Sequence, residues 1–292
     1  MDPEELTAVG APVRAELPPN TRMGPVHLTV ADLDRSLAYY EQQIGLQVHA
    51  RDGGRAQLGT GGEDLLVLTE EPGARPAEGY SGLFHFALLV PERIDLARWL
   101  AHAARDRVPL TGMSDHFVSE ALYLRDPDHH GIEVYADRPW ELWEGQVGTR
   151  LTTLPLDTDD LLATLEDPLA EPFDGLPGGT VMGHVHLCVA GVEQTVEYYR
   201  DVVGFGLMAQ LGDQAAFLSA GGYHHHLGGN TWQSAGRPYA PAGYARLTQM
   251  TIVLPDAAAL EAVAERVGAR EAGDGVRVAD PSGIPALFTT AA

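Results

Sequence analysis

Apolar and polar positions follow the same pattern in two segments, one starting at Met23 and the other at Met182. They read "MGPVHLTVADLDRSLAYYEQQIGL" and "MGHVHLCVAGVEQTVEYYRDVVGF". Each opens with the two-residue alternation of a strand, passes a turn, and continues with helical spacing up to a glycine suited to end a helix. Three alternating runs follow each copy, and the second set ends in "YHHHLGG". The repeated unit is predicted to be a strand, a helix and three further strands.

Two more segments repeat this order with weaker similarity. One begins with "LFHFALLVP" and ends with "ALYLRDPDHHGIEVYADRP", and the other begins with "LTQMTIVLP" and ends with "GVRVADPSGIPALFTT". Internal repetition on this scale indicates an architecture built from one unit. We therefore expect four βαβββ modules, beginning near Val26, Leu83, Val185 and Leu247.

The modules suggest a division of the chain into four segments. We expect a flexible arm over 1–22, modules one and two over 23–139, a connector over 140–180, and modules three and four over 181–292. The connector contains Trp, Pro and acidic residues, and its "DTDDLLATLED" predicts a short surface helix.

Composition narrows the choice of partners and compartment. The 292 residues carry a net charge of −22, which repels nucleic acid and anionic lipid. The start of the chain lacks the pattern of a signal peptide, and no apolar run reaches the length of a membrane span. The single cysteine, Cys188, excludes an intrachain disulfide. We expect a cytoplasmic protein that binds neither nucleic acid nor membrane.

The succession of four βαβββ modules resembles the vicinal oxygen chelate superfamily, from Met23 onward. That superfamily includes glyoxalase I, fosfomycin and bleomycin resistance proteins, and extradiol ring-cleaving dioxygenases. The resemblance implies an α+β fold in which modules pair into two half-open, barrel-like domains, with a metal ion held inside a pair.

Candidate metal ligands come from strand faces. A divalent ion that keeps open positions for substrate needs two imidazoles and one carboxylate on one face. Alternate strand residues share a face, so His27, His85, His186 and Glu133 can point inward. Aligning the first strands makes His27, His85, His186 and Gln249 equivalent. Aligning the last strands sets Glu133 against Pro285 or Ala286, so module four offers no carboxylate.

Four stretches resemble the catechol 2,3-dioxygenase subgroup: "GLFHFALLVP", "DHFVSEALYL", "GIEVYADRP" and "SAGGYHHH". The residues alone leave open whether His27 or His186 is the third ligand beside His85 and Glu133. His184 shares the strand face of His186 and could compete with it. The resemblance favours His85, Glu133 and His186 as ligands, because the histidine triplet lies in module three. It implies that modules two and three pair, and that His225 is the acid/base beside the metal.

The resemblance implies an Fe(II)-dependent extradiol dioxygenase that uses O2 to convert a small aromatic diol of the catechol type into a muconic semialdehyde. Mn(II) suits the same ligands. Tyr123 is expected to donate a hydrogen bond to a substrate oxygen, and His116 to stand at the pocket mouth. A homo-oligomer is expected from the same resemblance.

Two alternatives are weighed against this function. A glyoxalase-type isomerase needs a carboxylate from each paired module, and module three is expected to place His225 there instead. A non-catalytic drug-binding protein needs no metal triad. The convergence of three ligand-type residues therefore argues against it. His27 has no assigned role, and His129 and His130 are expected to lie on a surface turn.

Overall fold

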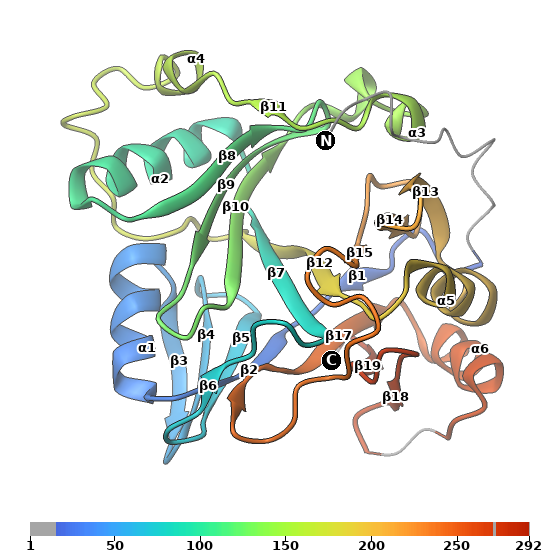
Figure 1. Ribbon diagram of the computed structural model, residues 1–292. Coiled ribbons are helices and arrows are strands. Elements are labelled where there is room, and N and C mark those ends of the chain that lie inside the picture. Colours follow the sequence, from blue (N-terminus) through green and yellow to red (C-terminus); the bar gives the residue numbers. More distant parts are fainter. Residues whose placement is uncertain (1–15, 271–272, 292) are drawn as a thin grey trace.

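Two large mixed sheets form the molecule, whose computed structural model describes residues 16–270 and 273–291. The first sheet, which fills the upper part of Figure 1, is built around the antiparallel pair of β7 and β12. Its strands, in spatial order, are β11 (Leu154–Pro155), β8 (Leu110–Asp115), β9 (Ser119–Arg125), β10 (Gly131–Asp137), β7 (Gly82–Leu89), β12 (Val181–Cys188), β15 (Leu227–Asn230), β14 (Ala215–Ser219) and β13 (Gly206–Leu211).

The second sheet is built in the same way around the antiparallel pair of β17 and β2. Its strands, in spatial order, are β18 (Val276–Ala279), β19 (Pro285–Thr290), β17 (Leu247–Leu254), β2 (Val26–Val30), β5 (Asp64–Glu70), β4 (Arg55–Gly59) and β3 (Gln47–Asp52), with β1 (Arg22–Met23) also beside β17. A separate two-stranded ribbon pairs β16 (Tyr244–Ala245) with β6 (Arg75–Pro76).

These sheets show how the four modules pair. The first sheet combines module two with module three, and the second combines module one with module four. The expected α+β class with paired half-barrels is confirmed, as is the pairing of modules two and three. Each sheet thus takes one module from each of the chain segments 23–139 and 181–292.

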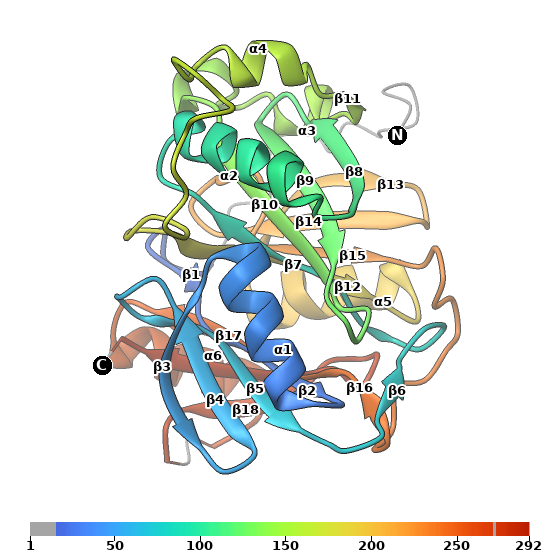
Figure 2. The same cartoon turned by 90° about the vertical axis from the view of Figure 1, so that its left-hand side faces the viewer.

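Helices cover the outer faces of the sheets. Figure 2 shows α1 over β4 and β5, and α2 over β9 and β10. The helices are α1 (Leu33–Tyr39) with its π-helical continuation Tyr40–Ile44, α2 (Arg93–Asp106), α5 (Val192–Val196) with its π-helical continuation Glu197–Val203, and α6 (Ala257–Val267). The connector holds a 3₁₀ turn (Trp140–Leu142), α3 (Val147–Arg150) and α4 (Thr158–Leu162). None of the helices in the described part of the chain has the length and apolar character of a membrane span.

Paired tyrosines on the module helices tie neighbouring modules together. Tyr40 and Tyr199 are fully buried in the hydrophobic core. The hydroxyl of Tyr40 donates to the carboxylate of Asp126 in module two, 2.9 Å away. Tyr199 donates in the same way to Asp280 in module four, at 3.4 Å. Each pair satisfies two buried polar groups and fixes one module against the next.

Candidate metal centre and its cavity

The candidate metal centre lies where β7, β12 and β10 run side by side. His85 on β7 stands opposite His186 on β12, and Ala87 stands opposite His184. Glu133 on β10 is in register with Ala87. Because alternate residues of a strand share a face, the three histidines and Glu133 point to the same side of the sheet.

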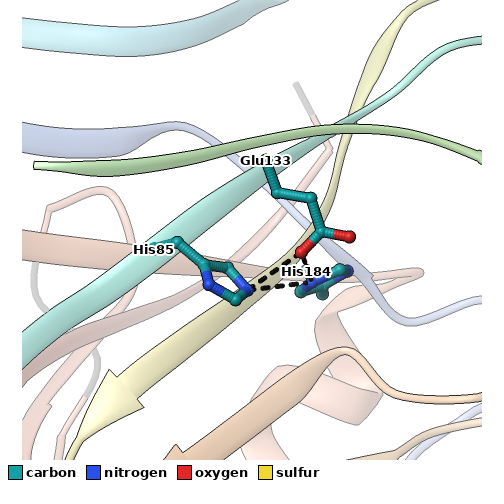
Figure 3. Close-up of side chains that lie close together, drawn as sticks. All are labelled: His85, Glu133 and His184. Carbon is teal, nitrogen blue, oxygen red and sulfur yellow. Dashed lines mark hydrogen bonds and ion pairs between the residues drawn. The ribbon is translucent and has the colours of Figure 1, made fainter. Parts of the chain in front are cut away.

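Three donor atoms converge on that side, as Figure 3 shows. The Nε2 atoms of His85 and His184 lie 3.0 Å and 3.1 Å from Oε2 of Glu133, and 3.4 Å from each other. All three side chains are buried. Two imidazoles and one carboxylate on one face are the ligand set of non-haem iron sites that keep positions open for substrate.

Burial sets the charges of these ligands. Desolvation alone would raise the pKa of Glu133, but the neighbouring His184 and His85 hold it well below its usual range. Burial lowers the pKa of His184 to about 4, against the opposing pull of Glu133. A neutral imidazole beside a carboxylate is the state in which both can donate electron pairs to a divalent ion.

His186, the ligand expected from the sequence, is not among the converging donors. It packs beside His85 with ring centres 5.0 Å apart, and its Nε2 has no hydrogen-bond partner among the described residues. The geometry therefore favours His184 over His186 as the third ligand. The physical reason is the register: His184 and Glu133 flank Ala87 in one row across the sheet, whereas His186 stands one step along the strand, opposite His85.

A countable signal in the sequence distinguishes the two histidines. His85 lies five residues before Val90, the residue after β7, and His184 lies five residues before Val189, the residue after β12. His186 lies only three residues before Val189, as His27 does before Val30. The expected equivalence of His85 with His186 and His27 is therefore wrong. The register sets His85 opposite His186, and the spacing to the helix that follows makes His85 equivalent to His184.

A cavity of about 310 Å³ opens beside the donor atoms. Its wall includes all of the expected site residues, namely His85, Glu133, His186, His225, Tyr123 and His116, together with His184. Phe84, Phe217 and Trp232 supply aromatic surface. Trp232 is 45% exposed, which places it at the mouth. A small flat ring fits the shape and the apolar character of such a pocket.

His116 and Tyr123 form a hydrogen-bonded pair in the wall. His116 Nδ1 donates to the carbonyl of Thr152 at 2.6 Å, so in the neutral ring Nε2 is an acceptor. The hydroxyl of Tyr123 lies 2.7 Å from that Nε2 and donates to it. Burial, with the charge of Glu133, holds the pKa of Tyr123 well above its usual value. Tyr123 is therefore a neutral hydroxyl at this end of the cavity.

The histidine triplet lies on a turn and not on a strand. Gly221 and Gly222 have φ of 65° and 80°, which glycine adopts without strain, and β15 begins only at Leu227. The ring of His225 reaches the cavity and stands 4.1 Å from the ring of His184, centre to centre. His226 turns away and accepts from the backbone N–H of Ala220 at 3.2 Å.

The position that corresponds to Glu133 in module three is Gly228. Glu133 is the strand partner of Ala87. Ala87 corresponds to His186 in module three, and the strand partner of His186 is Gly228. The expectation that His225 occupies this position is wrong. A Cβ at Gly228 would stand 2.8 Å from Nδ1 of His186, so His186 fills the space that a second carboxylate would need.

The turn that carries His129 and His130 is only partly as expected. His129 is exposed and pairs with Glu78. His130 is buried, contrary to expectation, because its Nδ1 bonds to the buried carboxylate of Asp126 at 2.9 Å. Neither lies in the metal centre.

Comparisons with known proteins agree on the family. The family model described as "Glyoxalase/Bleomycin resistance protein/Dioxygenase superfamily" matches residues 22–134. The chain is 39% identical over 273 residues to a protein of Bacillus subtilis (strain 168) named catechol-2,3-dioxygenase, covering 90% of this chain and 94% of that protein.

Solved structures show the same fold. A putative dioxygenase of Bacillus subtilis superposes with a TM-score of 0.61 at 15% identity, over 92% of this chain and 86% of the other. Glyoxalase I of Zea mays superposes with a TM-score of 0.56 at 17% identity, over 93% and 92% of the two chains. At these identities the likeness concerns the fold alone.

Proposed function

The chain belongs to the glyoxalase, bleomycin resistance protein and dioxygenase superfamily, and from this premise we propose that it is an Fe(II)-dependent extradiol dioxygenase acting on catechol-type diols. The relative named catechol-2,3-dioxygenase, which matches almost the full chain, supports this direction. The observation that carries the proposal is the asymmetry of the metal centre: one buried carboxylate, Glu133, and a glycine at its counterpart, Gly228.

The donor set fits a ferrous ion in its size and chemistry. The three ligand atoms already lie within 4.8 Å of one another, and their side chains are buried. His85, Glu133 and His184 would hold the ion. When bound, iron would supply a Lewis-acidic centre where both catechol oxygens and O2 can meet. Mn(II), with the same preference for hard ligands, is the second candidate.

The residues of the cavity would orient the diol and move its proton. Phe217 and Trp232 offer faces against which an aromatic ring can pack and exclude water. His225 stands beside His184, where its imidazole can accept a proton from a catechol hydroxyl and later return one to the product. In the cavity wall the Tyr123 hydroxyl, whose proton goes to His116, would accept a hydrogen bond from a substrate hydroxyl, and His116 would hold that hydroxyl in place.

The missing second carboxylate argues against the isomerase alternative. A glyoxalase-type centre draws a carboxylate from each of its two modules, whereas here His186 occupies that space beside Gly228. Three protein ligands would leave more room at a bound ion than four would. A diol that offers two oxygens, with O2 as co-substrate, would need that room.

Oxygen uptake tests the proposal. The protein is reconstituted with Fe(II) under anaerobic conditions and mixed with catechol in aerated buffer, while oxygen consumption and the yellow ring-cleaved product are followed. Wild type and His27→Ala are expected to consume oxygen, and His184→Ala is not. Turnover of a hemithioacetal without oxygen consumption would favour the isomerase, and catechol binding without turnover in the metal-loaded protein would favour a binding protein.

A further inference from the structure

A hydrogen-bonded chain of three side chains runs from the edge of the molecule to the cavity. Asp137, the last residue of β10, has a side chain that is 24% exposed. Its Oδ1 lies 2.9 Å from Nε2 of His224. Nδ1 of His224 lies 2.8 Å from Nδ1 of His225, whose ring reaches the cavity. The first two members of the triplet are therefore linked to one carboxylate.

Packing holds the middle member of the chain in place. His224 is fully buried and lies against Tyr223, with ring centres 4.0 Å apart, and against Trp143 at 5.7 Å. Tyr223 is itself fixed by a hydrogen bond between its hydroxyl and that of Tyr135, 2.7 Å long. The imidazole of His224 thus has little freedom to rotate away from Asp137.

The hydrogen bonds from Asp137 to His225 determine which ring nitrogen of His224 and of His225 carries hydrogen. An ionised carboxylate only accepts, so Nε2 of His224 must be the N–H that donates to Asp137. A neutral imidazole has one N–H, which leaves Nδ1 of His224 as an acceptor. Nδ1 of His225 must then donate to it, and Nε2 of His225 keeps its lone pair. No described residue hydrogen-bonds to this Nε2, which is the nitrogen left for a ligand in the cavity.

We propose that Asp137 and His224 are positioning residues, which hold His225 as its Nδ1–H tautomer so that Nε2 can accept the proton of a bound hydroxyl. The tautomer assignment rests on the hydrogen bonds of a neutral His224 ring. Its catalytic consequence rests on the proposed function. The same inference gives separate roles to the triplet: His225 meets the ligand, His224 orients His225, and His226 braces the turn through Ala220.

Nitrogen chemical shifts of the histidine rings test the assignment without any assay of activity. The full chain, labelled with 15N-histidine and loaded with diamagnetic Zn(II), is examined by long-range 1H–15N correlation. We expect a protonated Nδ1 and an unprotonated Nε2 for His225, and the reverse for His224. Asp137→Asn is expected to mix or invert both tautomers, because an amide can donate as well as accept. His226→Asn, which keeps an acceptor near Ala220, is the matched control and is expected to leave them unchanged.

A second variant covers the case in which Asp137→Asn does not fold. His224→Asn keeps a polar group near the position of Nδ1 but loses the bond to Asp137, and it is expected to give a mixed tautomer at His225. A wild-type His225 protonated at Nε2 would overturn the proposal. An unchanged His225 in the folded Asp137→Asn or His224→Asn protein would overturn it as well.

Kinetics test the catalytic consequence. With Fe(II) and catechol, Asp137→Asn is expected to lower kcat about 10²-fold while KM and bound iron stay near wild type, since general-base catalysis contributes about 10² to 10⁴. Formate is expected to restore part of the activity of Asp137→Ala, which a merely structural defect would not permit. A changed tautomer with unchanged kcat would overturn the catalytic role. Wild type without oxygen uptake would refute the proposed function and leave the tautomer result standing.

Discussion

The two sheets share one architecture, yet among the described residues only the first sheet carries a candidate set of metal ligands. In the first sheet the central register sets His186 opposite His85, and in the second it sets His27 opposite Gln249. Following this correspondence along both strand pairs, the metal centre and its counterpart differ at most positions. The corresponding pairs, first sheet and then second, are His85 and Gln249, His184 and Pro25, Glu133 and Leu287, His186 and His27, and Gly228 and Val67.

The difference teaches what the repeated fold does and does not supply. It brings five positions to the centre of each strand pair, but the chemistry depends on which residues stand there. In the second sheet the amide of Gln249 donates to Nε2 of His27 at 3.3 Å, and neither Pro25 nor Leu287 can bind a cation. Burial, with nearby Arg55 and Arg277, lowers the pKa of His27 to about 4. His27 is thus a neutral histidine hydrogen-bonded to Gln249.

Corresponding substitutions in the two sheets should differ in their effect on activity and on bound iron. We expect Glu133→Gln to lower catechol cleavage about 10³-fold or more, since a metal supplies several kcal/mol of charge stabilisation. Bound iron, measured by elemental analysis, should fall with it. Gln249→Ala, at the position of the second sheet that corresponds to His85, should retain both. Iron retained by Glu133→Gln but lost in Gln249→Ala would reverse the comparison.

Changing the acid/base should separate catalysis from metal binding. His225→Gln is expected to lower kcat about 10² to 10⁴-fold while one ion stays bound per chain, because the side chain moves a proton and does not hold the metal. Stopped-flow absorbance of the product gives kcat, and elemental analysis gives the iron. Loss of iron in His225→Gln would make His225 a ligand and contradict its role here.

The glycine opposite His186 offers a test by coupled substitutions. Gly228→Ala brings a Cβ within 2.8 Å of His186 Nδ1, and overpacking of this kind costs about 1–3 kcal/mol in the free energy of unfolding. Adding His186→Ala should relieve that cost. Urea unfolding of the two single variants and the double variant measures the coupling, and additive effects would show that His186 does not exclude a side chain at Gly228.

Trp232 should affect the substrate and little else. Trp232→Ala removes an aromatic face at the cavity mouth. KM for catechol is expected to rise about 2- to 10-fold, as an aromatic contact contributes about 0.5–1.5 kcal/mol. Trp140, which is 37% exposed and lies outside the cavity, is the control, and Trp140→Ala should leave KM unchanged. Equal effects of both substitutions would argue against a role of Trp232 in binding.

Much of the site could be predicted because strand periodicity and repetition carry it. The repeats located the modules, and the positions of His85, Glu133 and His225 pointed to the pairing of modules two and three that the sheet displays. His116 and Tyr123 line the same cavity, as expected. Their catalytic roles remain predictions.

The third ligand and the triplet's geometry could not be predicted because periodicity does not resolve them. His184 and His186 share a face, and only the register of β12 against β7 separates them. A register shift adjoins His184 at Gly183, where a Cβ would come within 1.9 Å of the Tyr135 hydroxyl. Because of the glycine turn, β15 begins only at Leu227. Gly228, and not His225, therefore stands at the position that corresponds to Glu133.

The position of the metal itself tests the central claim most directly. Crystals of the protein grown with Fe(II) under anaerobic conditions should give one anomalous peak per chain at the iron absorption edge. We expect it in direct contact with His85 Nε2, His184 Nε2 and a Glu133 oxygen. A peak bound by His186 in place of His184, or a peak between His27 and Gln249 in the second sheet, would contradict this account.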